Sequence, residues 1–305
     1  MSSTDRSATG IDLAVRDLRI DRGGTTILDD VSFTVPAGST LAVVGTNGSG
    51  KSTLLRGLVG VTPPASGEID IGGRIRTAGP RAARRWARRR AHEMAFVSQE
   101  ELPAAELSVA EAVSLGRTPH RKPWAGHDPG EHAAVAAALD AVGLTELGGM
   151  SCARLSGGQR HRVVIARALA QDTPVILLDE PTNHLDPVWR LRLLEALRAS
   201  GRTVLFSLHE LDMVMQYADN VAVLHEGTVH AFGPPGEVFT PELVREVFAV
   251  DSAVVRRPGA GSGSGPEPAA GSAANPEHLV LWHREDDDAD SATDIDEGPE
   301  KGRTS

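Results

Sequence analysis

The segment 45–52, which reads GTNGSGKS, has the residue types and spacing of a phosphate-binding loop. Its three glycines allow the backbone to curl so that successive N–H groups face one point, and a following helix adds its dipole there. Lys51 is long enough to reach the outer phosphates of a nucleotide, and the Ser52 hydroxyl is placed to bind Mg²⁺. The segment therefore predicts a nucleotide-phosphate site.

An acidic pair ends a later apolar segment, in the sequence VILLDEP at 175–181. The four apolar residues predict a buried strand, and Asp179 at its end can join the coordination shell of Mg²⁺. Glu180 follows on the opposite side of the backbone, where it can polarise an attacking water. Alone, such a pair is as often a solvated strand end. Together with a phosphate loop, it predicts a metal ligand and a catalytic base.

Two further polar side chains follow other apolar segments. His209 comes shortly after TVLFS at 203–207, and Gln99 comes directly after MAFVS at 94–98. Each residue alone reads as an ordinary surface or structural residue. However, a parallel sheet presents the residues at its strand ends to ligand, so His209 is placed to hydrogen-bond a terminal phosphate.

The sequence LSGGQ at 155–159 begins an amphipathic segment and contains no lysine for phosphate binding. It makes chemical sense when it is pressed against a nucleotide that another copy of the chain holds. With the phosphate loop before it and the acidic pair after it, the segment predicts an ATPase that works as a dimer.

Short apolar segments alternate with amphipathic ones along most of the chain. Strands are expected at 11–20, 25–28, 31–35, 39–44, 175–179 and 203–208, and hairpins at 67–77 and around 225–228. Helices are expected at 51–60, 107–116, 131–144, 159–171 and 188–200, with another helix before the last hairpin. This order favours a mostly parallel α/β sheet with a helical insertion in its middle.

Composition limits the class of protein. The chain has 305 residues, 40% of them hydrophobic, so it can bury a full core. The net charge is −10, but residues 258–305 contain eleven acidic and three basic residues, so the remainder is nearly neutral. Because a nucleic-acid-binding protein needs a basic face, this balance argues against a nucleic-acid partner.

Cysteine usage and hydropathy indicate the compartment. Cys152 is the single cysteine, so no internal disulfide is possible and a reducing compartment is expected. The first ten residues lack the apolar core of a signal peptide. No apolar stretch approaches the roughly 18 residues that cross a bilayer, so another chain is expected to supply any membrane span.

The composition divides the chain into three parts. Residues 1–10 are expected to be disordered, and 11–257 to form the folded unit, with a helical subdomain at about 100–160. Residues 258–305 are expected to be a flexible linker and an acidic tail. Within that last part, HLVLWHR at 278–284 is consistent either with a short docked strand or with further disorder.

With five motifs in this order, residues 11–257 resemble the nucleotide-binding subunit of an ATP-binding cassette (ABC) transporter. The resemblance implies a P-loop NTPase fold with a RecA-like, mostly parallel sheet, an antiparallel β subdomain and an inserted α-helical subdomain. It also implies ATP and Mg²⁺ as ligands and a homodimer that shares two nucleotide sites.

The resemblance assigns a role to each motif, residue by residue. It implies catalytic roles for Glu180, His209, Lys51 and Gln99, and Mg²⁺ binding by Ser52, Gln99 and Asp179. The residues expected to contact ATP are Gly45, Thr46, Asn47, Gly48, Ser49, Gly50, Lys51, Ser52, Thr53, Ser156, Gly157, Gly158, Gln159 and Asp186.

Three positions depart from the family pattern. Thr46 stands where Pro is usual, which affects the stiffness of the loop, and His161 stands where Gln is common. The aromatic residue that stacks on adenine is expected near 21–22, where this chain has Asp21 and Arg22. Since a guanidinium can stack on a base, Arg22 is the candidate adenine contact, with a solvated turn residue as the alternative.

The branch of the family follows from what surrounds the motifs. The chain has no fused membrane spans, second cassette or long coiled-coil insertion, which favours an importer subunit. Residues 113–126 and 232–255 resemble the cassettes of iron-siderophore, haem and vitamin B12 importers. The resemblance implies uptake of an iron-siderophore complex, or of haem or cobalamin, through a transmembrane permease that receives substrate from a binding protein.

The resemblance also places the ATPase at the cytoplasmic face of the cell membrane, as a peripheral subunit. The alternatives are an importer ATPase for another small solute and a soluble ATP-driven switch in a non-transport complex.

Six arginines lie between Arg81 and Arg90 and suggest contacts with nucleic acid or lipid headgroups. The favoured interpretation is a solvated helix that leads to Gln99, because the family carries a basic helix at this place. Trp86 within this segment is expected to pack against the core or the permease.

Overall fold

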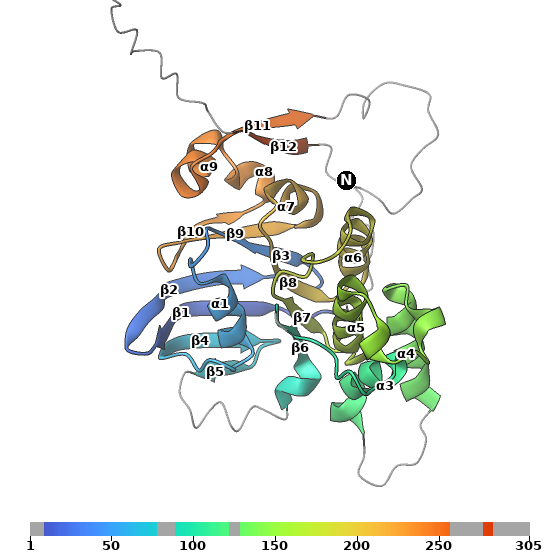
Figure 1. The fold of residues 1–305 in the computed structure, drawn as a ribbon. Coiled ribbons are helices and arrows are strands. Elements are labelled where there is room, and N and C mark those ends of the chain that lie inside the picture. Colours follow the sequence, from blue (N-terminus) through green and yellow to red (C-terminus); the bar gives the residue numbers. More distant parts are fainter. Residues whose placement is uncertain (1–8, 78–88, 100, 122–128, 257–276, 283–305) are drawn as a thin grey trace, which may run out of the picture.

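The computed structural model describes residues 9–77, 89–99, 101–121, 129–256 and 277–282 (Figure 1). A six-stranded sheet separates a four-stranded antiparallel sheet on one side from four helices on the other. These helices are α3 (Val109–Ser114), α4 (Pro129–Ala141), α5 (Gly157–Ala170) and α6 (Pro187–Ala199). The predicted α/β fold, with an antiparallel β subdomain and a helical insertion, is confirmed.

The six-stranded sheet has the strand order β10-β9-β3-β8-β7-β6. Its strands are β3 (Thr40–Val44), β6 (Met94–Val97), β7 (Val175–Leu178), β8 (Thr203–Ser207), β9 (Asn220–His225) and β10 (Thr228–Gly233). All neighbouring pairs are parallel except β9 and β10, which form the predicted hairpin at the edge. Parallel strands with both faces covered read as continuous apolar runs, and for this reason the sequence predicted them well.

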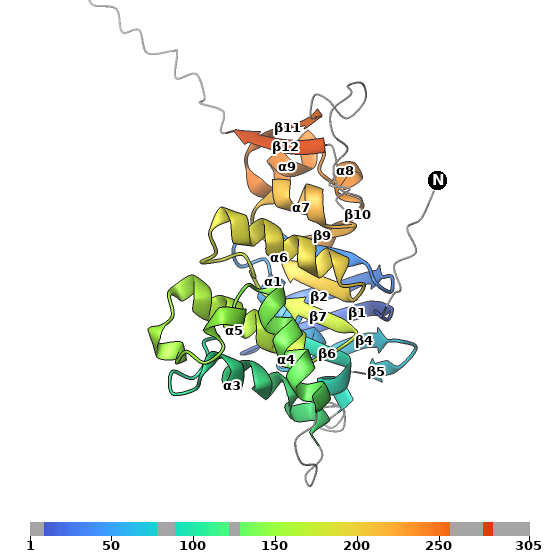
Figure 2. The same cartoon turned by 90° about the vertical axis from the view of Figure 1, so that its right-hand side faces the viewer.

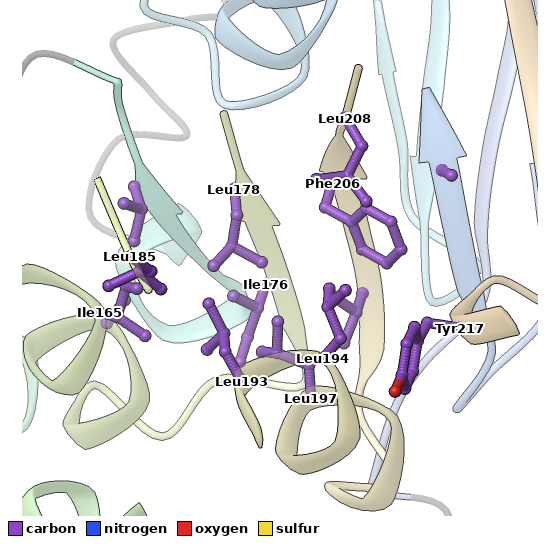
Figure 3. Packing of buried hydrophobic residues seen from close by; sticks show 14 of the residues in the cluster. Ile165, Ile176, Leu178, Leu185, Leu193, Leu194, Leu197, Phe206, Leu208 and Tyr217 are labelled. Atoms are coloured by element: carbon purple, nitrogen blue, oxygen red, sulfur yellow. The ribbon is translucent and has the colours of Figure 1, made fainter. Parts of the chain in front are cut away.

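The strands of this sheet bury side chains on both faces. In β7, Val175 and Leu177 join the apolar cluster beneath the antiparallel sheet, whereas Ile176 and Leu178 join the cluster beneath the helices. Figure 3 shows Ile176 and Leu178 on the side of the sheet where Leu193 of α6 packs. Because successive side chains of a strand point in opposite directions, one strand contributes to both cores.

The antiparallel sheet has the order β2-β1-β4-β5. Its strands are β1 (Leu13–Arg22), β2 (Thr25–Val35), β4 (Ser66–Ile71) and β5 (Ile75–Thr77). The expected separate strands 25–28 and 31–35 form one strand, so that prediction was wrong. Asp30 has a left-handed backbone with φ of 50°, and the register with β1 shifts beside it. Aspartate tolerates this conformation, so the sequence that suggested a turn makes a bulge within β2.

The C-terminal part packs on one end of the molecule (Figure 2). It contains α7 (Leu211–Tyr217), α8 (Pro235–Val238), α9 (Pro241–Phe248), β11 (Asp251–Arg256) and β12 (Glu277–Trp282). β12 pairs antiparallel with β11, and Leu279 is buried in the larger apolar cluster. Of the two alternatives for this segment, 277–282 is the docked strand. The expected boundary at 257 therefore separates β11 from its partner strand.

Some expectations concern the ends of the chain and its long connections. Gly10, expected in a disordered N-terminal segment, donates its N–H to the carbonyl of Gly201 at 3.0 Å. Residues 1–8, most of the arginine-rich segment with Trp86, most of the linker, and 283–305 lie outside the described residues. Among the residues that are described, no helix combines the length and the apolar character needed to cross a membrane.

Candidate functional site

Four neighbouring strands end at the same edge of the six-stranded sheet. Gly45 follows β3 directly, and Gln99 lies two residues after β6. Asp179 follows β7, and His209 lies two residues after β8. Because these strands are parallel neighbours, their carboxyl ends meet, and the sheet brings together four motifs that the sequence separates.

The loop 45–50 has the backbone that its glycines predicted. Gly45, Gly48 and Gly50 have φ of 151°, 83° and 102°. A Cβ atom on Gly45 would lie 2.2 Å from the carbonyl oxygen of Leu224, so only glycine fits there. Gly50 caps helix α1 (Lys51–Leu58) without a side-chain hydrogen bond, which leaves N–H groups of the first turn available to an anion.

The Lys51 ammonium lies inside the curve of this loop. Its Nζ donates to the carbonyls of Gly45 at 2.8 Å and Thr46 at 3.0 Å, and the residue is 6% exposed. Burial lowers the pKa of Lys51, and the negative charges of Glu180 and Asp179 oppose that shift. A buried ammonium with carbonyl partners is a strong donor for a phosphate oxygen.

The remaining loop residues lie around this ammonium. Thr46 and Asn47 are exposed, and Thr53 is half-buried in the first turn of α1. Ser49 is buried, and its Oγ has no hydrogen-bond partner within the described ranges.

Asp179 is completely buried beside the loop. Its Oδ1 accepts from Ser52 Oγ at 3.0 Å and from Ser207 Oγ at 2.8 Å. Its Oδ2 is also buried and has no hydrogen-bond partner in the part of the chain that the structure describes. A buried carboxylate oxygen without a donor is unusual, and Mg²⁺ prefers oxygen ligands such as this carboxylate and the Ser52 hydroxyl. The residues therefore fit a nucleotide phosphate with Mg²⁺.

Glu180 is held by three side chains. Its Oε2 accepts from Gln99 Nε2 at 2.6 Å and from the Asn183 amide, and its Oε1 lies 2.6 Å from His209 Nε2. The backbone of Glu180 is left-handed, with φ of 51°. Non-glycine residues in this conformation are most frequent at functional sites, where surrounding contacts stabilise the unfavourable backbone.

Two members of this cluster were absent from the expectations. Ser207 Oγ donates to Asp179 and accepts the backbone N–H of Glu180 at 2.8 Å, so it orients both acidic residues. A single serine at the end of the apolar run TVLFS is the signal that could have found it. Asn183 contacts Glu180 from three residues further along the chain, and the sequence carries no comparable signal for it.

The segment Ser156–Gln159 forms the start of α5. Ser156 Oγ accepts the N–H of Gln159 at 3.2 Å, and the Gln159 side chain accepts the N–H of Ser156 at 2.9 Å, which is a capping box. A Cβ on Gly157 would meet nothing within 4 Å, whereas one on Gly158 would lie 2.8 Å from the carbonyl oxygen of His184.

In the described structure, Ser156–Gln159, which we call the signature segment, does not contact the phosphate loop of the same chain through a hydrogen bond. Helix α5 packs in the cluster on the helical side of the sheet, and α1 packs in the cluster on the other side (Figure 1). Among the described residues, no hydrogen bond links Ser156–Gln159 to 45–53. The structure therefore brings the phosphate loop together with Gln99, the Asp179–Glu180 pair and His209, and leaves Ser156–Gln159 apart from that loop.

Asp186 and Arg22 also lie apart from the Glu180 cluster. Asp186 is the N-cap of α6, and its Oδ1 accepts the N–H groups of Val188 and Trp189 at 3.1 Å each. Arg22 is exposed at the end of β1, where it pairs with Thr25 in the β1–β2 hairpin.

Comparison with known proteins agrees with this geometry. The family described as ABC transporter matches residues 28–183, which is half of the chain. The cobalamin import ATP-binding protein of Halobacterium salinarum is 39% identical over 254 residues, which cover 82% of this chain. The hemin import ATP-binding protein of Thermobifida fusca is 39% identical over 255 residues, which cover 82% of this chain and 86% of the relative.

The solved structures show the same relationship. A metal-chelate type ABC transporter in an inward-facing conformation has a TM-score of 0.70 at 27% identity, covering 89% of this chain and 98% of the other. The present chain spans 62% of the length of the Halobacterium relative. A family match over half the sequence, relatives at 39% identity and the observed fold lead to one conclusion: the chain belongs to the ABC transporter family.

Proposed function

We propose that this chain is the ATP-hydrolysing subunit of an importer that takes up a metal chelate: an iron-siderophore complex, or haem or cobalamin. The main support for ATP hydrolysis is that two adjacent carboxylates contact different side chains. Asp179 faces Ser52, and Glu180 is held by Gln99 and His209. One carboxylate is thus placed for a metal ion and the other for a water molecule.

Each residue of the cluster has a distinct role in the proposed hydrolysis. Lys51 and the N–H groups of the loop 45–53 bind the phosphates of ATP. Ser52, Asp179 and Gln99 would hold Mg²⁺, which would neutralise negative charge on the phosphates. Glu180 accepts a proton from water as the water oxygen bonds to the γ-phosphorus and the bond to the departing ADP oxygen breaks.

His209 and the signature segment complete the proposed site. His209 Nε2 now contacts Glu180 and is placed to hydrogen-bond the γ-phosphate once Glu180 turns to the water. Ser156–Gln159 of a second copy closes the nucleotide from the opposite side, with Asp186 at the contact between copies. ATP bound between two copies then stabilises the dimer, and hydrolysis lets it open.

The proposed partners follow from the relatives. The matching proteins carry names for cobalamin and hemin import, and the structural neighbour is of the metal-chelate type. Haem and cobalamin are both metal chelates, as are iron-siderophore complexes. We propose that this chain binds a transmembrane permease, which receives its substrate from a substrate-binding protein. The subunit would lie at the cytoplasmic face of the membrane, and Arg22 is the proposed adenine contact.

A Glu180→Gln substitution tests the catalytic role. The amide keeps the size of the side chain but accepts no proton, so ATP hydrolysis should fall by roughly 100-fold or more. Binding of ATP should persist, because Lys51 and the loop are unchanged, and size-exclusion chromatography with ATP should show a stable dimer. The matched control is Glu195→Gln, which makes the same chemical change at an exposed position of α6. Hydrolysis by Glu180→Gln at the parent rate would show that Glu180 is not the base.

The substrate needs a separate experiment. The permease that co-purifies with the full chain should be identified, and cells that carry both proteins should be tested for uptake of ferric siderophores, haem and cobalamin. Uptake that depends on Glu180 supports import of the transported chelate. Hydrolysis without a membrane partner and without uptake of any of the three would refute the proposed transport role.

A further inference from the structure

His161 lies on α5, two residues after the signature segment. The residue is 5% exposed, and its Nε2 lies 2.9 Å from the carbonyl oxygen of Pro181. Because a carbonyl oxygen can only accept, Nε2 of His161 carries the hydrogen. Within the described part of the chain, no other side chain or backbone N–H donates to Pro181.

Pro181 belongs to a strained turn that carries the proposed catalytic base. Glu180 and His184 are both left-handed, with φ of 51° and 64°. For residues other than glycine, each such conformation is unfavourable and persists only when its surroundings hold it. The contact from His161 to Pro181 lies one peptide unit after Glu180, inside this turn.

A second contact joins the same two segments. Gly158 of α5 lies so close to the turn that a Cβ there would be 2.8 Å from the carbonyl oxygen of His184. The turn is therefore supported by α5 at both ends: by Gly158 near His184 and by the His161 ring at Pro181. Only the second contact is a hydrogen bond that a side chain supplies.

We propose that His161 is a positioning residue for ATP hydrolysis, because its hydrogen bond to the Pro181 carbonyl fixes the turn that aims Glu180. This inference rests on the proposed role of Glu180 as the base. It has a consequence in the dimer. The signature segment and Glu180 of one chain would face different nucleotides, so the His161–Pro181 contact ties the two sites to each other.

A pair of substitutions isolates the hydrogen bond. His161→Gln keeps an amide N–H that can reach the carbonyl, and His161→Met has similar length but no donor. In the full chain, His161→Met should lower kcat by roughly 10-fold to 100-fold, as small displacements of catalytic groups do. The KM for ATP should stay within about twofold, because the phosphate loop is untouched. His161→Gln should restore kcat to within about threefold of the parent.

Thr173→Val is the matched control. Thr173 is buried and donates to the carbonyl of Val175 at 2.8 Å, at the end of β7 opposite Asp179. This variant loses a buried side-chain-to-carbonyl hydrogen bond without touching the turn, so it should keep the parent kcat. If His161→Met does not fold, His161→Asn replaces it, since its shorter amide does not reach the carbonyl.

Three results would overturn the proposal. One is parent-like kcat in a folded His161→Met or His161→Asn variant. The second is an equal loss of kcat in His161→Gln, and the third is an equal loss in Thr173→Val. The Glu180→Gln variant separates this failure from a failure of the proposed function: if it is inactive while His161→Met is active, Glu180 remains the base and only the positioning role is lost.

Discussion

Asp179 and Glu180 are neighbours in the chain, yet their carboxylates have different partners. Asp179 is bonded to Ser52 and Ser207, and Glu180 to Gln99 and His209 among others. The alternation of side chains along a strand predicts this separation. Glu180 lies two residues after the end of β7 and has a left-handed backbone. Their roles in catalysis remain predictions.

The protonation of His161 leads to a prediction at the scale of one residue. Burial lowers the pKa of His161, the hydrogen bond to the Pro181 carbonyl opposes that shift, and the nearby His184 adds to it. As pH falls below the ordinary value of 6.5, the unfolded chain takes up a proton on this residue more readily than the folded chain does. The parent should therefore lose more thermal stability than His161→Gln when the pH falls from about 7.5 to about 5.5.

Thermal unfolding of both chains, followed by circular dichroism at each pH, measures this difference. The other titrating groups are common to the two chains, so the His161→Gln variant is its own control. An identical loss of stability in both chains would mean that burial does not keep His161 neutral.

At the scale of elements, the helix starts expected from the sequence lie within two residues of the observed ones, whereas strand β2 was expected as two separate strands. Helices α3 and α5 both begin with a serine followed three residues later by Glu or Gln, and both form a capping box. These are contacts within four residues, so the sequence contains them completely. The end of a strand depends on its neighbours, and β2 continues through Asp30 because β1 pairs with it on both sides of the bulge.

The docking of β12 gives a prediction at this scale. Leu279 is 4% exposed, and its N–H and the His278 ring both contact Asp212 of α7 at 3.2 Å. Leu279→Ala removes buried apolar surface, so it should lower the free energy of unfolding by about 2 kcal/mol or more. Leu281→Ala makes the same change at a position that is 41% exposed and should cost less than about 0.5 kcal/mol.

Urea unfolding of the full chain measures both values. Equal decreases in the free energy of unfolding for the two substitutions would show that β12 does not pack against α7 in solution.

At the scale of the whole molecule, the position of the signature segment is the central feature. It lies on α5, across the six-stranded sheet from the helix that follows the phosphate loop. A single chain therefore holds this segment apart from its own phosphate loop, as the proposed closure by a second copy requires. The sequence predicted that second copy because the segment contains no phosphate-binding lysine.

Two serine caps test this arrangement. Ser156→Ala and Ser108→Ala each remove the serine of a capping box, at α5 and α3, and each should cost about 1 kcal/mol of stability. In the Glu180→Gln background, Ser156→Ala should also raise the ATP concentration needed for dimerisation by about tenfold, because it loses a hydrogen bond to a charged phosphate. Light scattering across an ATP titration measures the dimer, and an equal shift in Ser108→Ala would contradict the proposed contact.

The sequence by itself determined that the chain binds a nucleotide phosphate on a mostly parallel α/β fold. The reason is that the loop 45–52 and the apolar strands are local patterns, complete within a few residues. Only the tertiary structure decided that Ser52 and Asp179, which are 127 residues apart, share a hydrogen bond. It also decided that 277–282 is a docked strand and that His161 hydrogen-bonds the Pro181 carbonyl in the turn after Glu180. These contacts depend on the register of parallel strands and on the packing of distant segments, which no local pattern encodes.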